Sequence, residues 1–595
     1  MALCHAMLSP LDVLHSTFGF SAFRGRQAEV IDRVMAGAHT LAVMPTGAGK
    51  SLTYQIPALC RAGTALVVSP LIALMHDQVR AAAAAGIQAA ALTSADDNRG
   101  ETINRFRDGA LDLLYVAPER FATPGFRALL DAGPQLALIA IDEAHCVSEW
   151  GHAFRPDYRL LRPVLDSYPG VPRLALTATA DRHTRADILA QLGIPEDGLI
   201  LAGFDRPNIR YAITPRDGLT RQLVTFVDDN PGAGIIYAPT RDGTERIAAA
   251  LAKTGRPVRT YHAGLEPAVR AANQKAFVAS EDMVMVATIA FGMGIDKPDV
   301  RFVAHAGLPK SVEAYYQETG RAGRDGDPAV AQLFWGAEDF ARARHRIEND
   351  VDETRRTSER QRLDALGALV ESGSCRRAIL LRHFGETPPL TCGNCDNCLN
   401  PPENVDATQT AQKLLSAVYR TGERYGVGHL ADVLTGATSE RVRALGHDRL
   451  SVHGIVDGSE QALIKPVARL LLAHGALLPD EHGGLALGPT ARPILRGEEM
   501  VTLVLPPKKA RTRKTRGRAE DWPHDPLFDA LRDCRRELAK AQGVPPYVIF
   551  HDATLREMAL LKPHDRSALA MVSGVGERKL EAYGEAFLAA IRNAA

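Results

Sequence analysis

The chain has 595 residues, of which 46% are hydrophobic and 24% are charged. This length predicts about four domains, and the composition excludes a chain dominated by low-complexity disorder. Lys and Arg together number 70, as do Asp and Glu, so the formal net charge is zero, which neither supports nor excludes a polyanionic partner.

The beginning of the chain has no basic region followed by a long apolar run, so we expect no secretory signal. No stretch reaches the ~20 apolar residues that are needed to span a bilayer. The eight cysteines are too sparse for a disulfide scaffold. We therefore expect a cytoplasmic protein without a membrane partner.

Apolar runs alternate with longer helical segments from residue 40 to about residue 336. Runs of this length that are separated by helices predict parallel strands buried on both faces. We therefore expect two doubly wound α/β domains, over residues 1–205 and 206–340. The predicted strands are residues 41–44, 65–69, 113–117, 136–141 and 174–177 in the first domain, and 234–238, 258–262, 283–288 and 301–305 in the second.

The rest of the chain divides by composition. A cysteine-rich module is expected over residues 341–404, and helices with a short hairpin over residues 405–505. A basic linker over residues 506–521 precedes a small helical domain over residues 522–595.

Residues 44–51, MPTGAGKS, follow a predicted strand and precede a predicted helix, as a phosphate-binding loop does. Small residues let backbone N–H groups approach phosphates, and the start of the helix favours negative charge. Lys50 is expected to reach the β- and γ-phosphates of ATP, and Ser51 to hold Mg²⁺. Met44 replaces the first glycine of the general pattern. Other nucleotide-binding candidates in this loop are Thr46, Gly47 and Gly49.

The tetrapeptide DEAH begins at Asp142, directly after the predicted strand 136–141. Ligands of such sheets bind at the carboxyl ends of the strands. We expect Asp142 to bind Mg²⁺ and Glu143 to orient and activate the attacking water. The alternative is a helix-capping aspartate beside a solvated glutamate.

Residues 316–325, YQETGRAGRD, place Arg321 and Arg324 in the second predicted α/β domain. A guanidinium at the γ-phosphate accelerates phosphoryl transfer. ATP would then lie between the two domains, and its hydrolysis would release them, which is a two-state motor. We favour Arg324 as the finger, and a surface ion pair is the alternative for either arginine.

These segments match the motifs of superfamily 2 helicases in order, and further motifs make the chain resemble the RecQ family. FRGRQ at 23–27 is similar to that family's adenine-reading motif. By this resemblance, Phe20 and Arg24 sandwich the adenine and Gln27 binds its edge. Other matching segments are residues 69–78, 176–179, 204–208 and 287–296, the last of which brings Asp296 to the nucleotide site.

The resemblance implies two RecA-like α/β domains, a Cys₄ zinc module, a winged helix and a small all-α HRDC domain. It implies a 3′-to-5′ DNA helicase with DNA-stimulated ATPase activity, acting in repair and recombination. ATP, Mg²⁺ and Zn²⁺ are the implied cofactors. Single-stranded and duplex DNA are the implied partners, with a single-strand DNA-binding protein as a further candidate, and the implied location is the nucleoid.

The segment after DEAH is rich in aromatic and basic residues. Trp150, Phe154 and Tyr158 recur every four residues, with His152 and Arg155 between them. Such spacing is also typical of a helix core stripe, but Gly151 and Pro156 favour a loop. Bases stack on aromatic faces with ~1–3 kcal/mol each. The segment is similar to the loop that couples DNA binding to ATP hydrolysis in RecQ helicases.

Cys375, Cys392, Cys395 and Cys398 have the spacing C-x16-C-x2-C-x2-C. Four thiolates suit a tetrahedral structural Zn²⁺, and an iron–sulfur cluster is the alternative. The RecQ resemblance favours zinc.

The last third of the chain offers further contacts to nucleic acid. By resemblance to the winged helix, Arg441 and Arg443 are expected to bind duplex phosphates, and the wing is expected over residues 478–485. The short wing has no aromatic tip, which puts a strand-separating role in doubt. Residues 525–591 resemble an HRDC domain, with Tyr547 as a single-strand contact and protein docking as the alternative. Residues 508–518 hold seven Lys or Arg, and are interpreted as a DNA-binding tether or a simple spacer.

Two other functions share some of these sequence features. An RNA helicase of the DEAH type is disfavoured by the Cys₄ module and the aromatic segment. A binding protein with an inactive nucleotide site is disfavoured by the presence of Lys50, Asp142, Glu143 and Arg324.

Overall fold

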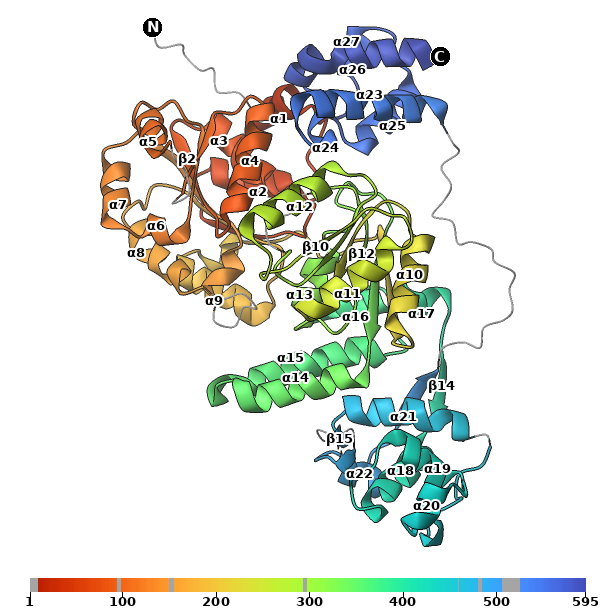
Figure 1. Ribbon diagram of the computed structural model, residues 1–595. Helices are drawn as coiled ribbons and strands as arrows, with labels where there is room; N and C mark the ends of the chain where they lie inside the picture. The colour runs from red at the N-terminus through yellow and green to blue at the C-terminus, as the bar shows by residue number, and fades with distance from the viewer. Residues whose placement is uncertain are drawn as a thin grey trace.

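The computed structural model describes residues 9–93, 98–148, 155–292, 297–458, 460–479, 484–505 and 525–594. Two parallel sheets lie between residues 40 and 335, and each is flanked by helices (Figure 1). No helix within the described ranges is both long and apolar enough to cross a membrane.

The first α/β domain has a seven-stranded sheet in the order β3-β4-β2-β5-β6-β1-β7, and all its neighbours pair in parallel. The strands are β1 (Thr40–Val43), β2 (Thr64–Val68), β3 (Ala89–Leu92), β4 (Leu113–Val116), β5 (Leu136–Ile141), β6 (Arg173–Thr177) and β7 (Leu199–Leu201). The helices are α1 (Pro10–Phe18), α2 (Gln27–Met35), α3 (Leu52–Cys60), α4 (Ile72–Ala84), α5 (Arg99–Arg107), α6 (Pro118–Phe121), α7 (Pro124–Asp131), α8 (Leu161–Leu165) and α9 (Arg182–Leu192).

The second α/β domain has a six-stranded parallel sheet in the order β10-β11-β9-β12-β13-β8. Its strands are β8 (Ile209–Pro215), β9 (Ala233–Tyr237), β10 (Val258–Tyr261), β11 (Val284–Ala287), β12 (Val300–His305) and β13 (Ala329–Trp335). Its helices are α10 (Leu219–Asp229), α11 (Arg241–Ala252), α12 (Pro267–Ala279) and α13 (Val312–Thr319).

The predicted fold class is confirmed in both domains. Each of the nine predicted strands is present, with bounds that agree to within one residue. Fully apolar runs such as 136–141 are buried along their whole length, as strands covered by helices on both faces must be. Four strands, β3, β7, β8 and β13, were not predicted.

A helical hairpin, α14 (Ala337–Asp350) and α15 (Glu353–Glu371), leads away from the second domain to the cysteine module (Figure 1). That module contains α16 (Arg376–His383) and α17 (Asp396–Leu399). The next domain is held by the antiparallel pair β14 (Glu403–Asp406) and β17 (Thr502–Leu505). It contains α18 (Thr408–Arg420), α19 (Val427–Leu434), α20 (Glu440–Ala444), α21 (Gln461–Ala473), α22 (Ala491–Leu495) and the hairpin of β15 (Leu477–Pro479) and β16 (Leu485–Leu487).

The C-terminal helical domain packs on the α/β domains, close to α1 and α12 (Figure 1). Glu281 forms ion pairs with Arg532 and Arg535 at 2.6 and 2.8 Å, and Arg556 binds Asp327 through both η nitrogens. The domain consists of α23 (Pro526–Gln542), α24 (Pro546–Ile549), α25 (Asp552–Leu561), α26 (Arg566–Ala570) and α27 (Glu577–Ala594).

Candidate active site

Three adjacent strands bring the predicted nucleotide-binding segments together. β5, β6 and β1 are neighbours in the first sheet. The phosphate loop follows β1, Asp142 follows β5, and Ala178 and Thr179 follow β6. Because parallel strands end at the same edge of a sheet, these three segments share one site.

The phosphate loop is folded around two glycines. Gly49 has a φ of 71°, and a Cβ at this position would lie 2.4 Å from the Gln27 Nε2 atom. That amide donates to the Ala48 and Gly49 carbonyls at 2.8 and 3.2 Å. The Lys50 ammonium lies 3.3 Å from the Met44 carbonyl, and Ser51 lies at the start of α3. The loop therefore turns tightly ahead of α3, and phosphate binding by Lys50 and Ser51 stays a prediction.

Gln27 and the two residues predicted to hold adenine lie together at the entry to α2. The Gln27 Oε1 atom accepts a hydrogen bond from the Arg24 N–H at 2.9 Å. The Arg24 guanidinium carbon lies 5.7 Å from the centre of the Phe20 ring. A base stacked between them needs roughly 7 Å, two van der Waals layers, so the pair must separate slightly to accept one. The adenine contact of Gln27 stays a prediction.

Glu143 adopts an uncommon backbone conformation. Its φ of 48° is left-handed, which costs a non-glycine residue about 1–2 kcal/mol. Such strain is concentrated at functional sites. The Glu143 N–H donates to Asp142 Oδ1 at 2.9 Å, and His145 Nδ1 lies 3.3 Å from Glu143 Oε2 and 3.0 Å from Thr177 Oγ1. The turn thus holds the carboxylate against the end of β6.

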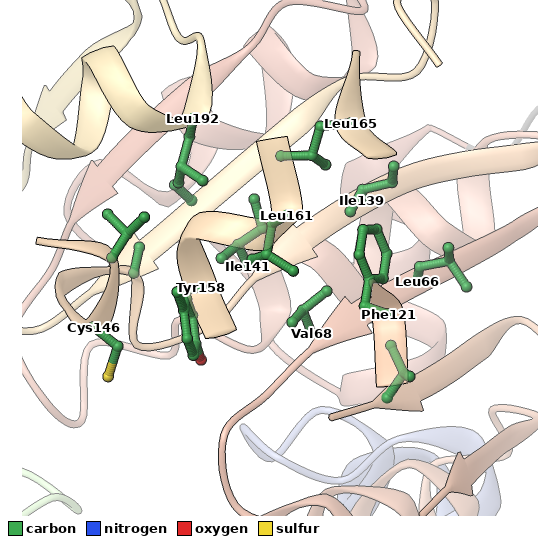
Figure 2. Packing of buried hydrophobic residues seen from close by; sticks show 14 of the residues in the cluster. Leu66, Val68, Phe121, Ile139, Ile141, Cys146, Tyr158, Leu161, Leu165 and Leu192 are labelled. Atoms are coloured by element: carbon green, nitrogen blue, oxygen red, sulfur yellow. The ribbon is translucent and has the colours of Figure 1, made fainter. Parts of the chain in front are cut away.

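Tyr158 belongs to the hydrophobic core and not to a base-stacking surface. Its ring is buried among residues of β2, β5 and α8, as Figure 2 shows. Its hydroxyl donates to the Asp142 carbonyl at 2.9 Å. For Tyr158, the core alternative is therefore right, because the ring packs beneath the strand that carries the DEAH turn. Trp150, His152 and Phe154 lie outside the described residues.

Arg155 connects the segment after DEAH to the loop after β2. Its N–H donates to the Cys146 carbonyl at 2.9 Å, and its Nη1 atom donates to the Pro70 carbonyl at 3.0 Å. The half-buried guanidinium thus joins two of the predicted motifs. Contact with DNA by Arg155 stays a prediction.

The two candidate arginine fingers have different surroundings. Arg321 is buried in the second domain, with Nη2 3.4 Å from the position of a Cβ on Gly292. Arg324 is half-buried, and its Cα atom lies 3.3 Å from where a Cβ on Gly47 would be. The backbone of Arg324 therefore packs on the phosphate loop, and its part as the finger stays a prediction. Asp296 lies outside the described residues.

Arg206 is a residue at this site that the sequence did not single out, although it lies in the 204–208 motif. Its guanidinium donates to the Thr46 carbonyl in the first domain and to the Gly320, Ala322 and Gly323 carbonyls in the second. The signal in the sequence that could have pointed to Arg206 was its place in the 204–208 motif, because that motif lies in a segment expected to connect the two domains.

The four cysteines converge as predicted. Their Sγ atoms all lie within 4.8 Å of one another, and the Cys375–Cys395 and Cys392–Cys398 pairs are 3.9 and 4.0 Å apart. Tetrahedral zinc with sulfur ligands at about 2.3 Å needs sulfur atoms about 3.8 Å apart, so the group fits the metal. Burial raises the pKa of Cys398, but backbone N–H groups of Cys392 and Gly393 outweigh it and lower that pKa to about 7.

The remaining candidate DNA contacts are partly accessible. Arg441 and Arg443 are exposed on α20, and Tyr547 is half-buried on α24 with its ring parallel to His551. The hairpin β15–β16 has the position of the predicted wing. Its tip, residues 480–483, and the basic run at 508–518 lie outside the described residues.

Five family models match the chain in succession. They are the DEAD/DEAH box helicase over residues 24–188, the helicase conserved C-terminal domain over 218–326, RecQ zinc-binding over 337–399, the RQC domain over 401–512 and the HRDC domain over 524–591.

Curated relatives match almost the whole chain. A protein of Pasteurella multocida named ATP-dependent DNA helicase RecQ is 42% identical over 98% of this chain and 93% of its own length. The protein of the same name in Haemophilus influenzae is 42% identical over 98% of this chain and 95% of its own length. That of Bacillus subtilis is 38% identical over 97% of this chain and 97% of its own length.

Proposed function

Since the chain belongs to the RecQ family of helicases, we propose that it is an ATP-dependent DNA helicase that unwinds duplexes in the 3′-to-5′ direction. DNA repair and recombination, at the nucleoid, are the proposed setting. The family supports the polarity and the setting. The geometry of the nucleotide site supports the chemistry.

The contact between the phosphate loop and the second domain carries this proposal. The Thr46 hydroxyl donates to the Gly320 carbonyl at 2.8 Å, and Arg324 packs against Gly47. A nucleotide in this loop therefore has arginines of another domain beside its phosphates. Binding and hydrolysis can then change how tightly the domains are held together, which is what a motor needs.

Each residue in the site has a proposed part in hydrolysis. Lys50 binds the β- and γ-phosphates, and Ser51 and Asp142 hold Mg²⁺, which neutralises phosphate charge when bound. Glu143, fixed by its left-handed backbone, orients the attacking water. Arg324 stabilises the charge that develops on the γ-phosphate.

Two part-buried contacts support coupling between this site and DNA. The Tyr158 hydroxyl donates to the Asp142 carbonyl, and Arg155 donates to the Pro70 carbonyl, so the chain directly after residues 149–154 is attached to motif residues. A base that stacks on Trp150 or Phe154 would therefore act seven or eleven residues after Glu143 in the chain. The exposed Arg441 and Arg443 are proposed to bind duplex phosphates, and Tyr547 single strands.

The deciding experiment measures ATP-dependent unwinding of tailed, forked and four-way DNA substrates. Duplexes with a 3′ tail should be unwound and those with a 5′ tail should not. ATPase activity should be stimulated by single-stranded DNA much more than by RNA of the same sequence. Stronger stimulation by RNA would favour the RNA helicase alternative, and ATP binding without turnover would favour a binding protein.

A single-strand DNA-binding protein is a candidate partner. Addition of that protein to the unwinding reaction should increase the rate beyond what trapping of the product strand explains. A control protein of similar DNA affinity from an unrelated source separates the two effects.

A further inference from the structure

The segment between β7 and β8 connects the two α/β domains, and Arg206 lies within it. Its side chain is buried, with 8% exposed. Burial lowers the pKa of this guanidinium, and its hydrogen bonds to backbone carbonyls satisfy its donors in place of water. A buried cation needs such compensation to be tolerated.

Four hydrogen bonds that the η nitrogens donate to backbone carbonyls divide between two functional segments. Nη1 donates to the Thr46 carbonyl at 2.8 Å and to the Gly320 carbonyl at 3.1 Å. Nη2 donates to the Ala322 and Gly323 carbonyls, both at 2.9 Å. The first acceptor belongs to the phosphate loop, and the other three flank Arg321 in the second domain. Since the η N–H groups are used in these bonds, Arg206 is placed to hold the segments and not to contact a phosphate.

The packing around these bonds leaves little freedom. A Cβ on Gly320 would lie 2.3 Å from the Thr46 hydroxyl oxygen. Asn208, two residues after Arg206, donates to the Gly323 and Asp327 carbonyls at 2.8 Å each. Arg206 and Asn208 thus both reach the turn that carries Arg324 from the 206–208 segment, and the Arg206 bridge joins that turn to the phosphate loop beside the direct hydrogen bond from Thr46 to Gly320.

The cysteine module holds the backbone of Arg206 in turn. Arg377 follows Cys375 in α16, and its Nη2 atom donates to the Pro207 and Ile209 carbonyls at 3.0 and 2.8 Å. The Asn394 amide also donates to the Pro207 carbonyl, at 3.1 Å. The Phe204 ring stacks on Phe384, which directly follows α16, with ring centres 4.5 Å apart. The zinc module therefore packs directly against the segment from which Arg206 extends.

We propose that Arg206 is a positioning residue for ATP hydrolysis, which joins the Thr46 carbonyl to the 320–323 turn and so sets Arg324 against the phosphate loop. The zinc module, through Arg377, holds Arg206 in place. This inference rests on the proposed ATPase function. It assigns the zinc module an effect on the rate of hydrolysis in addition to a structural part.

The test compares DNA-stimulated ATPase of Arg206→Gln, Arg206→Lys and the unaltered full-length chain. Arg206→Gln should lower kcat at least tenfold and change KM for ATP by less than about threefold, because Lys50 and Ser51 still bind the phosphates. Arg206→Lys keeps the charge and can reach part of the carbonyl set, so it should recover part of kcat. Trapping of ADP with aluminium fluoride should weaken in Arg206→Gln, while binding of a non-hydrolysable ATP analogue stays close to normal.

Arg256 is a matched control within the second domain. Its guanidinium also binds four carbonyls, of Val227, Asn230, Gly232 and Asp282, but none belongs to the nucleotide site. Burial lowers its pKa as it does for Arg206. Arg256→Gln should reduce thermal stability and leave kcat per active site unchanged.

Arg377→Gln extends the test and remains informative if Arg206→Gln does not fold. It should lower kcat with little change in KM while zinc content stays equal to that of the unaltered chain. A kcat within twofold of normal in Arg206→Gln, or an equal loss in Arg256→Gln, would overturn the proposal. Absence of DNA-stimulated ATPase in the unaltered chain would instead overturn the proposed function.

Discussion

Gly19→Ala should release the C-terminal helical domain from the α/β domains. Gly19 ends α1 with a φ of 71°, and its carbonyl accepts a hydrogen bond from the Gly574 N–H at 2.8 Å. A Cβ on Gly19 would lie 2.5 to 2.8 Å from backbone atoms of Val575 and Gly576. Backbone cannot rotate away as a flexible side chain can, so the two surfaces must separate.

The size of the effect follows from the packing. Overpacking of a close-packed contact costs about 1–3 kcal/mol, which corresponds to a roughly 5- to 150-fold shift in an equilibrium. The Gly574 amide is protected by its bond to Gly19, so its hydrogen exchange requires undocking. Its exchange rate in Gly19→Ala should therefore rise by the same roughly 5- to 150-fold.

Hydrogen exchange with mass spectrometry of peptides covering residues 572–578 measures this rate in the full-length protein. Gly37→Ala is the control, because Gly37 has a φ of 81° and no heavy atom within 4 Å of its Cβ position. That variant carries comparable backbone strain without the clash. Unchanged protection at Gly574 in Gly19→Ala would refute the docked arrangement. Glu281→Gln, which weakens the ion pairs with Arg532 and Arg535, should raise the same exchange rate independently.

Lys50→Ala should abolish ATP turnover in a steady-state ATPase assay and leave DNA binding, measured by fluorescence anisotropy, largely intact. Glu143→Gln should bind ATP in a filter-binding assay without hydrolysing it. Retained turnover in either variant would contradict the assigned parts. Trp150→Ala should lower DNA-stimulated ATPase more than basal ATPase, and a proportional fall of both would indicate a core residue. Metal analysis should find about one zinc per chain, and Cys395→Ser should lose the metal together with solubility, since zinc binding is coupled to folding. Iron with visible absorbance would contradict that choice. Replacement of all seven basic residues in 508–518 by Gln should flatten the slope of log K against log salt for duplex DNA by at least ~1, and an unchanged slope would leave this run as a spacer.

The sequence alone was sufficient for the parts of the molecule that depend on local pattern. Fully apolar runs such as 136–141 predicted the buried parallel strands, because a strand covered on both faces has no polar side. Strands with a weaker hydrophobic pattern were not predicted. β3 is rich in alanine, which is mainly a helix former, and β8 alternates buried and less buried residues at the edge of its sheet.

The position of the candidate site was also predictable where a motif carries it in adjacent residues. The glycines around Lys50, the DEAH turn and the cysteine spacing each specify a local backbone that binds one kind of group. These patterns are short, so they can be recognised in the sequence without knowledge of the tertiary contacts.

Tertiary structure decided which side chains in those patterns are accessible and which residues join them. Tyr158 shares its spacing with Trp150, yet it is core, because its hydroxyl reaches the Asp142 carbonyl beneath β5. Arg206 joins Thr46 to Gly320 across 160 and 114 residues of sequence separation. Its partners are backbone carbonyls, which every residue type has, so the sequence cannot specify them, and only the folded chain brings them within hydrogen-bonding distance.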